Sequence, residues 1–139
     1  MNSLLFGALH LSAEGHLPVD EAWARYTQPG WWPRWAPHLR TIDYPEPVIR
    51  PDTSGRVRGI GGVTADFHID AVDDAARTWA WSVRSGPLRL RFDHGVDAAP
   101  PGSEHVSRAW LVIHALWPVA LGYAPMARYS LGRLVAPDL

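Results

Sequence analysis

One histidine in this chain, His94, stands where an imidazole could do chemistry. Leu88, Leu90 and Phe92 precede it at alternate positions, so in a β-strand these side chains share one otherwise apolar face. An imidazole has an unperturbed pKa of about 6.5 and can serve as a general acid or base. The plainer interpretation is a histidine near a strand end that is hydrogen-bonded to backbone or water.

Other polar side chains alternate with apolar residues on other predicted strands. Arg108 and His114 share a face with Trp110, and His10 lies on the first predicted strand. Inside a cavity Arg108 could polarise a carbonyl group or bind a carboxylate, whereas on an outer face it is a solvated charge. If the faces converge, His10, His94 and His114 could approach one another. No local ligand spacing supports this cluster, and we predict neither a metal site nor a cofactor.

Several functional classes lack their motifs. The glycines between residues 59 and 62 lie between predicted strands with no helix after them, so they do not cradle phosphate. Neither a nucleophile elbow nor a zinc-protease motif occurs. The net charge of -1 and the pI of about 6.6 give no electrostatic attraction toward nucleic acid or an anionic membrane. We therefore predict no nucleic-acid partner.

Length and composition indicate one globular domain over residues 1–139. Hydrophobic residues make up 47% and charged residues 19%, which is typical of a folded soluble protein. There are no cysteines, the N-terminus lacks a basic leader, and no apolar stretch reaches the length of a membrane span. We expect a cytoplasmic protein. All 13 basic residues are arginine, which suggests a bacterial source with a GC-rich genome.

Helical segments are predicted near both ends of the chain. A first strand over residues 4–12 precedes a helix over 17–27, where Pro18 suits the first turn. Residues 30–37 hold three of the eight tryptophans and two prolines, so a short helix or turn is expected there. A longer helix follows Pro118 and runs to about Val135. With little charge along its length, it is expected to be covered on most sides.

Between the helices the hydrophobic period is two, which predicts strands over 39–44, 56–60, 63–71, 78–84, 88–96 and 105–116. Residues 52–55 are predicted as a turn. Val63, Ala65, Phe67, Ile69 and Ala71 form the cleanest buried face of the chain. The predicted architecture is α+β, with a curved antiparallel sheet of about seven strands wrapped around the C-terminal helix and two short helices after the first strand.

Several segments in this order also point to one family. They are residues 18–23 (PVDEAW), 32–35 (WPRW), 67–70 (FHID), 73–81 (DDAARTWAW), 94–96 (HGV) and 102–106 (GSEHV). With them the chain resembles the START-like, or birch-pollen-allergen-like, superfamily (SRPBCC), often labelled polyketide cyclase/dehydrase. The resemblance implies a helix-grip fold with a hydrophobic cavity between the sheet and the C-terminal helix.

We consider three alternative functions. The resemblance implies binding of a hydrophobic, aromatic or polyketide-like small molecule or lipid. It also implies a cyclase or dehydratase that uses the same cavity; the resemblance carries over no catalytic residue, and the strand pattern offers His94 and Arg108 as the catalytic groups. The third alternative is a protein-interaction or homodimer module, which the apolar back of the C-terminal helix, with Leu121, Leu131 and Val135, favours. The side chains expected to contact a ligand are Trp23, Trp32, Trp35, Phe67, Trp79, Trp81, Leu90, Phe92, Trp110, Tyr123 and Met126.

Overall fold

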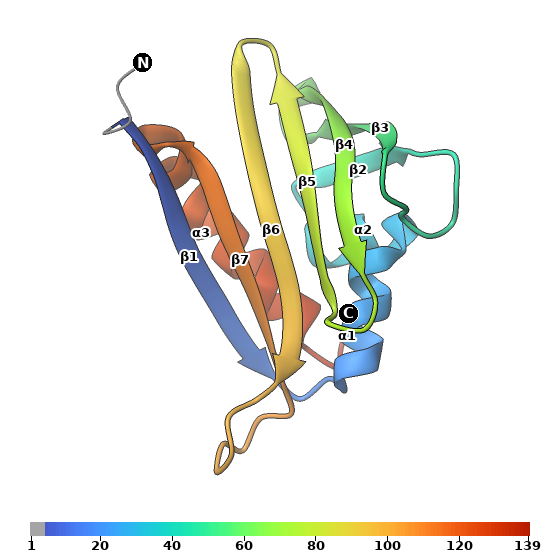
Figure 1. The fold of residues 1–139 in the computed structure, drawn as a ribbon, viewed down its shortest axis with the longest axis vertical. Helices are drawn as coiled ribbons and strands as arrows, with labels where there is room; N and C mark the ends of the chain where they lie inside the picture. Colours follow the sequence, from blue (N-terminus) through green and yellow to red (C-terminus); the bar gives the residue numbers. More distant parts are fainter. Residues whose placement is uncertain (1–4) are drawn as a thin grey trace.

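The computed structural model describes residues 5–139 and shows a seven-stranded antiparallel sheet curved around one long helix (Figure 1). The strands lie in the order β1-β7-β6-β5-β4-β3-β2, so the first strand pairs with the last. This confirms the predicted architecture, although Leu4, predicted in the first strand, lies outside the described residues. The elements are β1 (Phe6–Gly15), α1 (Val19–Thr27), η2 (Pro29–Trp31), α2 (Trp32–Trp35), β2 (Leu39–Asp43), β3 (Thr53–Gly59), η3 (Ile60–Gly62), β4 (Thr64–Asp73), β5 (Thr78–Ser85), β6 (Leu88–Ala98), β7 (Ser107–Leu116) and α3 (Trp117–Leu134).

Alternation along the strands sorts the side chains onto an inner face, toward the helices, and an outer face. Trp79 and Trp81 on β5 are buried on the inner face, as are Phe92 and His94 on β6. On β7, alternate residues from Ser107 to Ala115 are buried and the residues between them are only half-buried. The helices lie behind the sheet in Figure 1, so the outer face is turned toward the reader.

Strands β3 and β4 depart from the predicted pattern at three places. Val63, predicted on the buried face, precedes β4 and is 58% exposed. A register shift between Ile69 and Ala71 turns Ala71 outward and leaves it exposed, although we predicted it on the buried face. β3 begins at Thr53, inside the segment predicted as a turn. Gly55 belongs to this strand, where it pairs with Phe67, and glycine is needed because the Phe67 ring lies 2.5 Å from the place where a Cβ atom would stand. Composition alone misassigned this glycine to a turn.

The tryptophan-rich segment forms short helical turns, as predicted, and also ends α1. The indole N–H of Trp32 donates to the carbonyl oxygen of Tyr26 at 2.8 Å, and that of Trp35 donates to Arg25 at 3.0 Å. Both carbonyls belong to the last turn of α1, where no partner exists within the helix. Trp32 also stacks on Trp79, with ring centres 5.6 Å apart. Trp32 therefore joins the end of α1 to β5 of the sheet.

Arg25 holds the C-terminal end of α3. The residue is only 7% exposed, and its guanidinium donates to the carbonyl oxygens of Leu134 at 3.0 Å and Ala136 at 2.6 Å. Longer hydrogen bonds join it to two neighbouring carbonyls. A cation at this position interacts favourably with the negative end of the helix dipole. Trp31 packs beside the guanidinium, with its ring centre 5.6 Å from the central carbon of Arg25.

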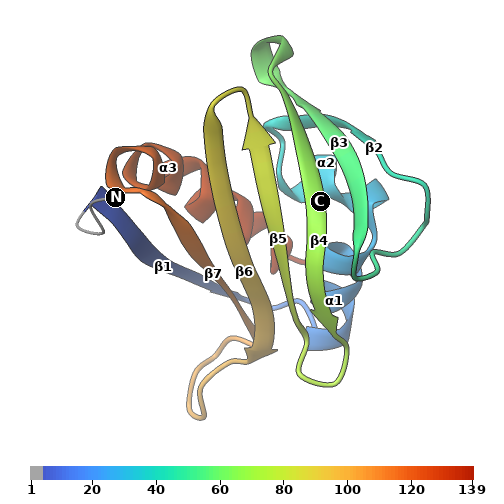
Figure 2. The ribbon, with the colours of Figure 1, turned by 45° about the horizontal axis from the view of Figure 1, so that its top comes forward.

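α3 packs along β1 and β7 but is less covered than the sequence indicates (Figure 2). Leu121 and Tyr129 are 58% and 59% exposed, which corrects the expectation of a helix covered on most sides. Leu131 and Val135, expected on a face available to a partner, are buried in the core. Within residues 5–139, no helix combines the length and hydropathy needed to cross a bilayer.

Candidate functional site

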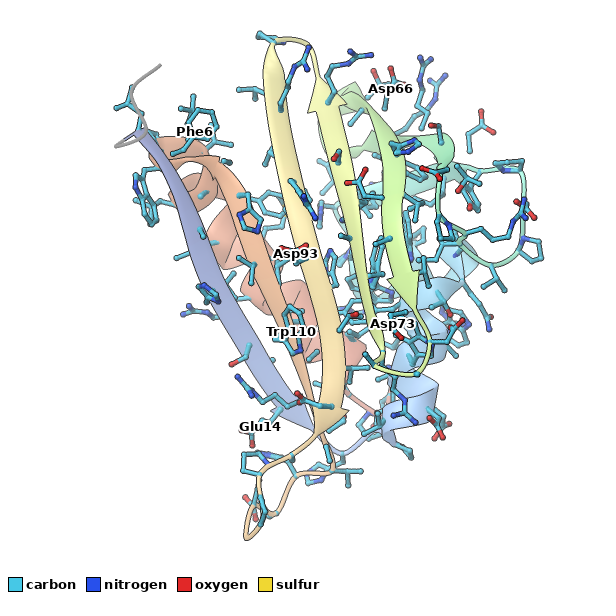
Figure 3. All side chains as sticks on the ribbon, viewed as in Figure 1. Phe6, Glu14, Asp66, Asp73, Asp93 and Trp110 are labelled. Carbon is cyan, nitrogen blue, oxygen red and sulfur yellow. The ribbon has the colours of Figure 1, made fainter. Side chains whose placement is uncertain are left out.

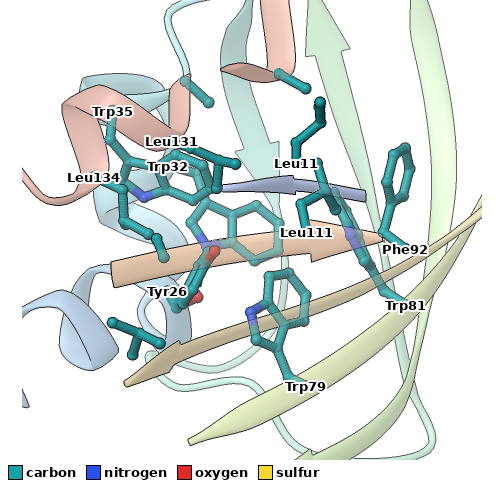
Figure 4. Close-up of a cluster of buried hydrophobic side chains, with 14 of the residues drawn as sticks. Leu11, Tyr26, Trp32, Trp35, Trp79, Trp81, Phe92, Leu111, Leu131 and Leu134 are labelled. Carbon is teal, nitrogen blue, oxygen red and sulfur yellow. The ribbon is translucent and has the colours of Figure 1, made fainter. Parts of the chain in front are cut away.

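Aromatic rings fill most of the space between the sheet and α3 (Figure 4). Trp79 stacks on His94, with ring centres 4.5 Å apart and 11° between the ring planes. Trp81 continues the cluster and lies 5.1 Å from Trp32 and 5.8 Å from Phe92, measured between ring centres. The rings thus occupy much of the region in which a ligand cavity was expected.

A cavity of about 30 Å³ remains between the inner face of the sheet and α3. This volume suits about one water molecule, whereas pockets for drug-sized ligands measure about 300–1,000 Å³. The lining is mainly apolar with a few polar groups, which is the usual composition of a ligand site. The lining residues are Trp35, Ala36, His38, Leu39, Trp81, Phe92, His94, Leu111, Tyr123, Ala127, Ser130 and Leu131.

The His94 imidazole is held as a neutral hydrogen-bond donor. The indole N–H of Trp81 donates to Nε2 of His94 at 3.0 Å, which places the ring proton on Nδ1. The residue is 6% exposed, and burial lowers the pKa of His94 to about 3. Within residues 5–139, Nδ1 has no hydrogen-bond partner. An unpaired buried donor is costly, so His94 suits an acceptor atom on a ligand.

A second polar contact joins α3 to the segment before β2. The hydroxyl of Tyr123 and Nε2 of His38 lie 2.8 Å apart and share a hydrogen bond. Burial lowers the pKa of His38 and raises the pKa of Tyr123, so both groups are neutral at physiological pH. The pair lines the cavity and connects its helical wall to the remainder of the site.

Only some of the predicted ligand-binding residues surround this cavity. Trp35, Trp81, Phe92 and Tyr123 line it. Others contribute to the hydrophobic core around it instead, namely Trp32, Phe67, Trp79 and Leu90.

Three predicted ligand contacts lie elsewhere. The indole N–H of Trp23 donates to Asp74 at 3.1 Å on the protein surface. Trp110 lies on the outer face, where its ring covers Gly95 (Figure 3). Met126 is 39% exposed on α3. The strand register turns Trp110 to the outer face, and the orientation of α3 exposes Met126. Trp23 on α1 is partly buried against the core but does not line the cavity.

The sheet separates His94 from the other polar candidates. Arg108 pairs with Asp97 in the strand register and lies on the outer face, whereas His94 is buried on the inner face. His10 and His114 are also on the outer face, where Nε2 of His114 lies 2.7 Å from a carboxylate oxygen of Asp93. His94 and Arg108 therefore do not share a site, and the three histidines do not converge.

Sequence reasoning missed three residues that shape the site. His38 follows Pro37 with no periodic pattern around it, so no signal assigned it to a face. Ser130 could have been found, because it lies seven residues after Tyr123 on the same side of the predicted helix. Arg25 contacts residues more than 100 positions away, and no local signal reveals such a contact.

A curved antiparallel sheet that grips a C-terminal helix, with two short helices after its first strand, defines the helix-grip fold of START-like and birch-pollen-allergen-like proteins. Two solved structures share it. The crystal structure of ginseng major latex-like protein 151 from Panax ginseng has a TM-score of 0.72 and 15% identity, with 94% of this chain and 95% of that chain covered. The crystal structure of Ara h 8.0201 has a TM-score of 0.66 and 15% identity, with 93% and 97% covered. No protein-family model and no curated protein sequence matches the chain.

Proposed function

We propose that the chain binds a small, flat, largely apolar molecule between the sheet and α3. The observation that carries this proposal is the cavity beneath α3, whose aromatic lining includes His94, a residue with an unpaired buried donor. A ligand with one carbonyl or hydroxyl oxygen would match a lining that is apolar apart from a few polar groups. The similar solved structures support this place for a ligand only through their common fold.

Binding requires the cavity to open, because about 30 Å³ cannot hold an aromatic molecule. The C-terminal half of α3 is held by Arg25, and Arg133 adds hydrogen bonds from its guanidinium to the carbonyl of Arg34. The N-terminal half contains Gly122 and Pro125, and Pro125 cannot donate to the carbonyl of Leu121. We infer that this half moves away from the sheet when ligand enters, which breaks the Tyr123–His38 hydrogen bond, while the other half stays in place.

Two buried leucines on α3 allow a matched test with 2-naphthol, a flat molecule with a single hydroxyl group. Leu131 lines the cavity and Leu134 does not, although both are buried on the same helix. Leu131→Ala enlarges the cavity and is expected to bind 2-naphthol more tightly than the parent chain, whereas Leu134→Ala is not. Ala127→Leu fills the cavity and is expected to abolish binding.

Ligand-detected NMR titration measures these affinities, and native mass spectrometry of protein purified from cells identifies a retained natural ligand. The proposal fails if Ala127→Leu leaves the affinity for 2-naphthol unchanged. It also fails if the two leucine variants bind the molecule equally.

The cyclase or dehydratase alternative receives less support from the geometry. Efficient proton transfer needs a group whose pKa lies near the working pH, and burial lowers the pKa of His94 to about 3. Arg108 lies on the far side of the sheet and cannot reach a molecule in the cavity. The interaction-module alternative loses Leu131 and Val135, since both are part of the core.

A further inference from the structure

Exposed apolar residues occur on several segments that meet at one end of the molecule, the upper end of the ribbon in Figure 1. This end combines the start of β1, the β3–β4 and β5–β6 turns, and the junction of β7 with α3. Each of these segments presents at least one large apolar side chain to solvent. They are Leu5, Phe6, Ile60, Val63, Leu88, Leu116, Trp117 and Leu121, exposed by 38% to 58%.

Arginines lie directly beside this apolar end, on the outer face of the sheet. The strand register places Arg56, Asp66, Arg84 and Arg89 side by side on β3, β4, β5 and β6, one position from the β5–β6 hairpin end. Asp66 pairs with Arg56 at 2.8 Å. Within residues 5–139, Arg84 and Arg89 make neither a hydrogen bond nor an ion pair with a side chain. Like charges directly opposite each other destabilise a sheet, so this pair favours an anionic partner.

We propose that this end of the molecule docks on the surface of an anionic lipid bilayer. The apolar side chains occur on separate protruding turns rather than along one groove, which fits shallow insertion at a bilayer interface better than a protein partner. Leu88 at the tip of the β5–β6 hairpin inserts between headgroups. Trp117 at the start of α3 packs one side of its ring on Gly7 of β1 and presents its exposed part, 38% of the residue, at the headgroup level. Arg84 and Arg89 face the lipid phosphates.

The distribution of charge, rather than its sum, supports this orientation. The net charge is -1, yet acidic residues crowd the opposite end, at the β4–β5 turn and the start of α1. These include Asp73 and Asp74 in the turn and Glu21 in the helix, whereas Asp20 is paired with Arg77. An anionic surface would repel that end and attract the arginine-bearing end. The docked end also contains the N-terminal half of α3, the part that moves in our proposed binding mechanism.

Vesicle co-sedimentation tests the docking with empty protein, so its outcome is independent of the proposed ligand. We expect the chain to pellet with vesicles of phosphatidylcholine mixed with phosphatidylglycerol and not with pure phosphatidylcholine. An arginine close to an anionic surface strengthens binding about fivefold, so Arg84→Gln with Arg89→Gln should weaken it about 25-fold. Leu88→Ser should also weaken binding, because it removes an inserted apolar side chain.

Matched controls lie at the other end of the molecule. Arg108→Gln removes the same charge from the outer face, and Val106→Ser removes an apolar side chain that is 47% exposed, compared with 44% for Leu88. Both controls should bind anionic vesicles like the parent chain. Circular dichroism verifies that every variant remains folded. Quenching by brominated lipid gives a second measurement, and Trp117→Phe should reduce it.

Three results would overturn the proposal. The parent chain could remain in the supernatant with anionic vesicles. The controls could lose as much vesicle binding as the matched variants. The chain would then bind the anionic surface without presenting this particular end to it. Inorganic phosphate could release the chain at constant ionic strength, which would mean a discrete anion site instead of a docking surface.

Discussion

Replacing His94 by glutamine is expected to remove much of the acid sensitivity of the folded chain. In the folded protein, burial lowers the pKa of His94 from 6.5 to about 3. Between these pH values the unfolded chain binds a proton at this position and the folded chain does not. The free energy of unfolding therefore falls as the pH falls through this range. Above it, the imidazole is neutral in both states and contributes no pH dependence.

The expected loss in the free energy of unfolding follows from the size of this pKa shift. Each pH unit below the unfolded pKa costs about 1.4 kcal/mol, so at about pH 4.5 the loss is about 3 kcal/mol. That is a large share of a total stability of about 5–15 kcal/mol. The penalty is an expected consequence of the site, because an imidazolium would have to form in a position that is 6% exposed and stacked against Trp79.

Urea unfolding followed by tryptophan fluorescence, from neutral pH to about pH 4.5, measures this loss. Glutamine at position 94 retains an acceptor for the indole N–H of Trp81, so the variant removes titration while it keeps the hydrogen bond. The free energy of unfolding of His94→Gln should still fall slightly with falling pH, because burial also lowers the pKa of His38.

His10→Gln on the exposed outer face is the control and should match the parent chain. If the parent chain and His94→Gln lose the same free energy over this range, His94 is not held neutral and our account of the site is wrong.

Two further changes test the contacts that hold the fold together. Arg25→Met leaves the C-terminal carbonyls of α3 unpaired and should lower the free energy of unfolding by about 3 kcal/mol. Arg34→Met, which removes a 3.4 Å hydrogen bond and an exposed cation–π contact with Trp31, should cost about 1 kcal/mol or less in the same urea assay. Gly95→Ala should cost about 1–3 kcal/mol, because its Cβ atom would stand 2.3 Å from the Trp110 ring. That cost should shrink when Trp110→Ala is also present, and an unchanged cost would contradict the reasoning.

Much of the fold could be predicted because the relevant signals are local. A strand that packs one face on a core alternates apolar and polar residues, and β5 and β6 show this alternation clearly. Proline near the start of α3 and the double glycine after β3 mark boundaries by their backbone preferences. The predicted strand boundaries were wrong where a contact between residues distant in the sequence determines them. Gly55 resembles a turn residue, but the ring of Phe67 and the carbonyl oxygen of Asp43, both on neighbouring strands, leave no space for a side chain there.

The candidate site was predictable only in part. Alternation correctly assigned His94 to the inner face with Phe92, since both lie on one regular strand. It could not decide which face of β7 is the inner one, because both are apolar, and so the position of Arg108 was left open and Trp110 was expected to contact a ligand. His38 lies outside any regular element and carried no signal, yet it contacts Tyr123 across the cavity.

The sequence by itself therefore determined the order of elements, the curved sheet and the histidine on its inner face. These follow from backbone preferences and from the two-residue period of strands, which act over a few residues. Only the tertiary structure decided that tryptophans reduce the cavity to about 30 Å³, that Arg25 holds the end of α3, and that arginines and apolar turns share one end. Volume, capping and surface charge depend on side chains that are distant in the chain and meet only after folding.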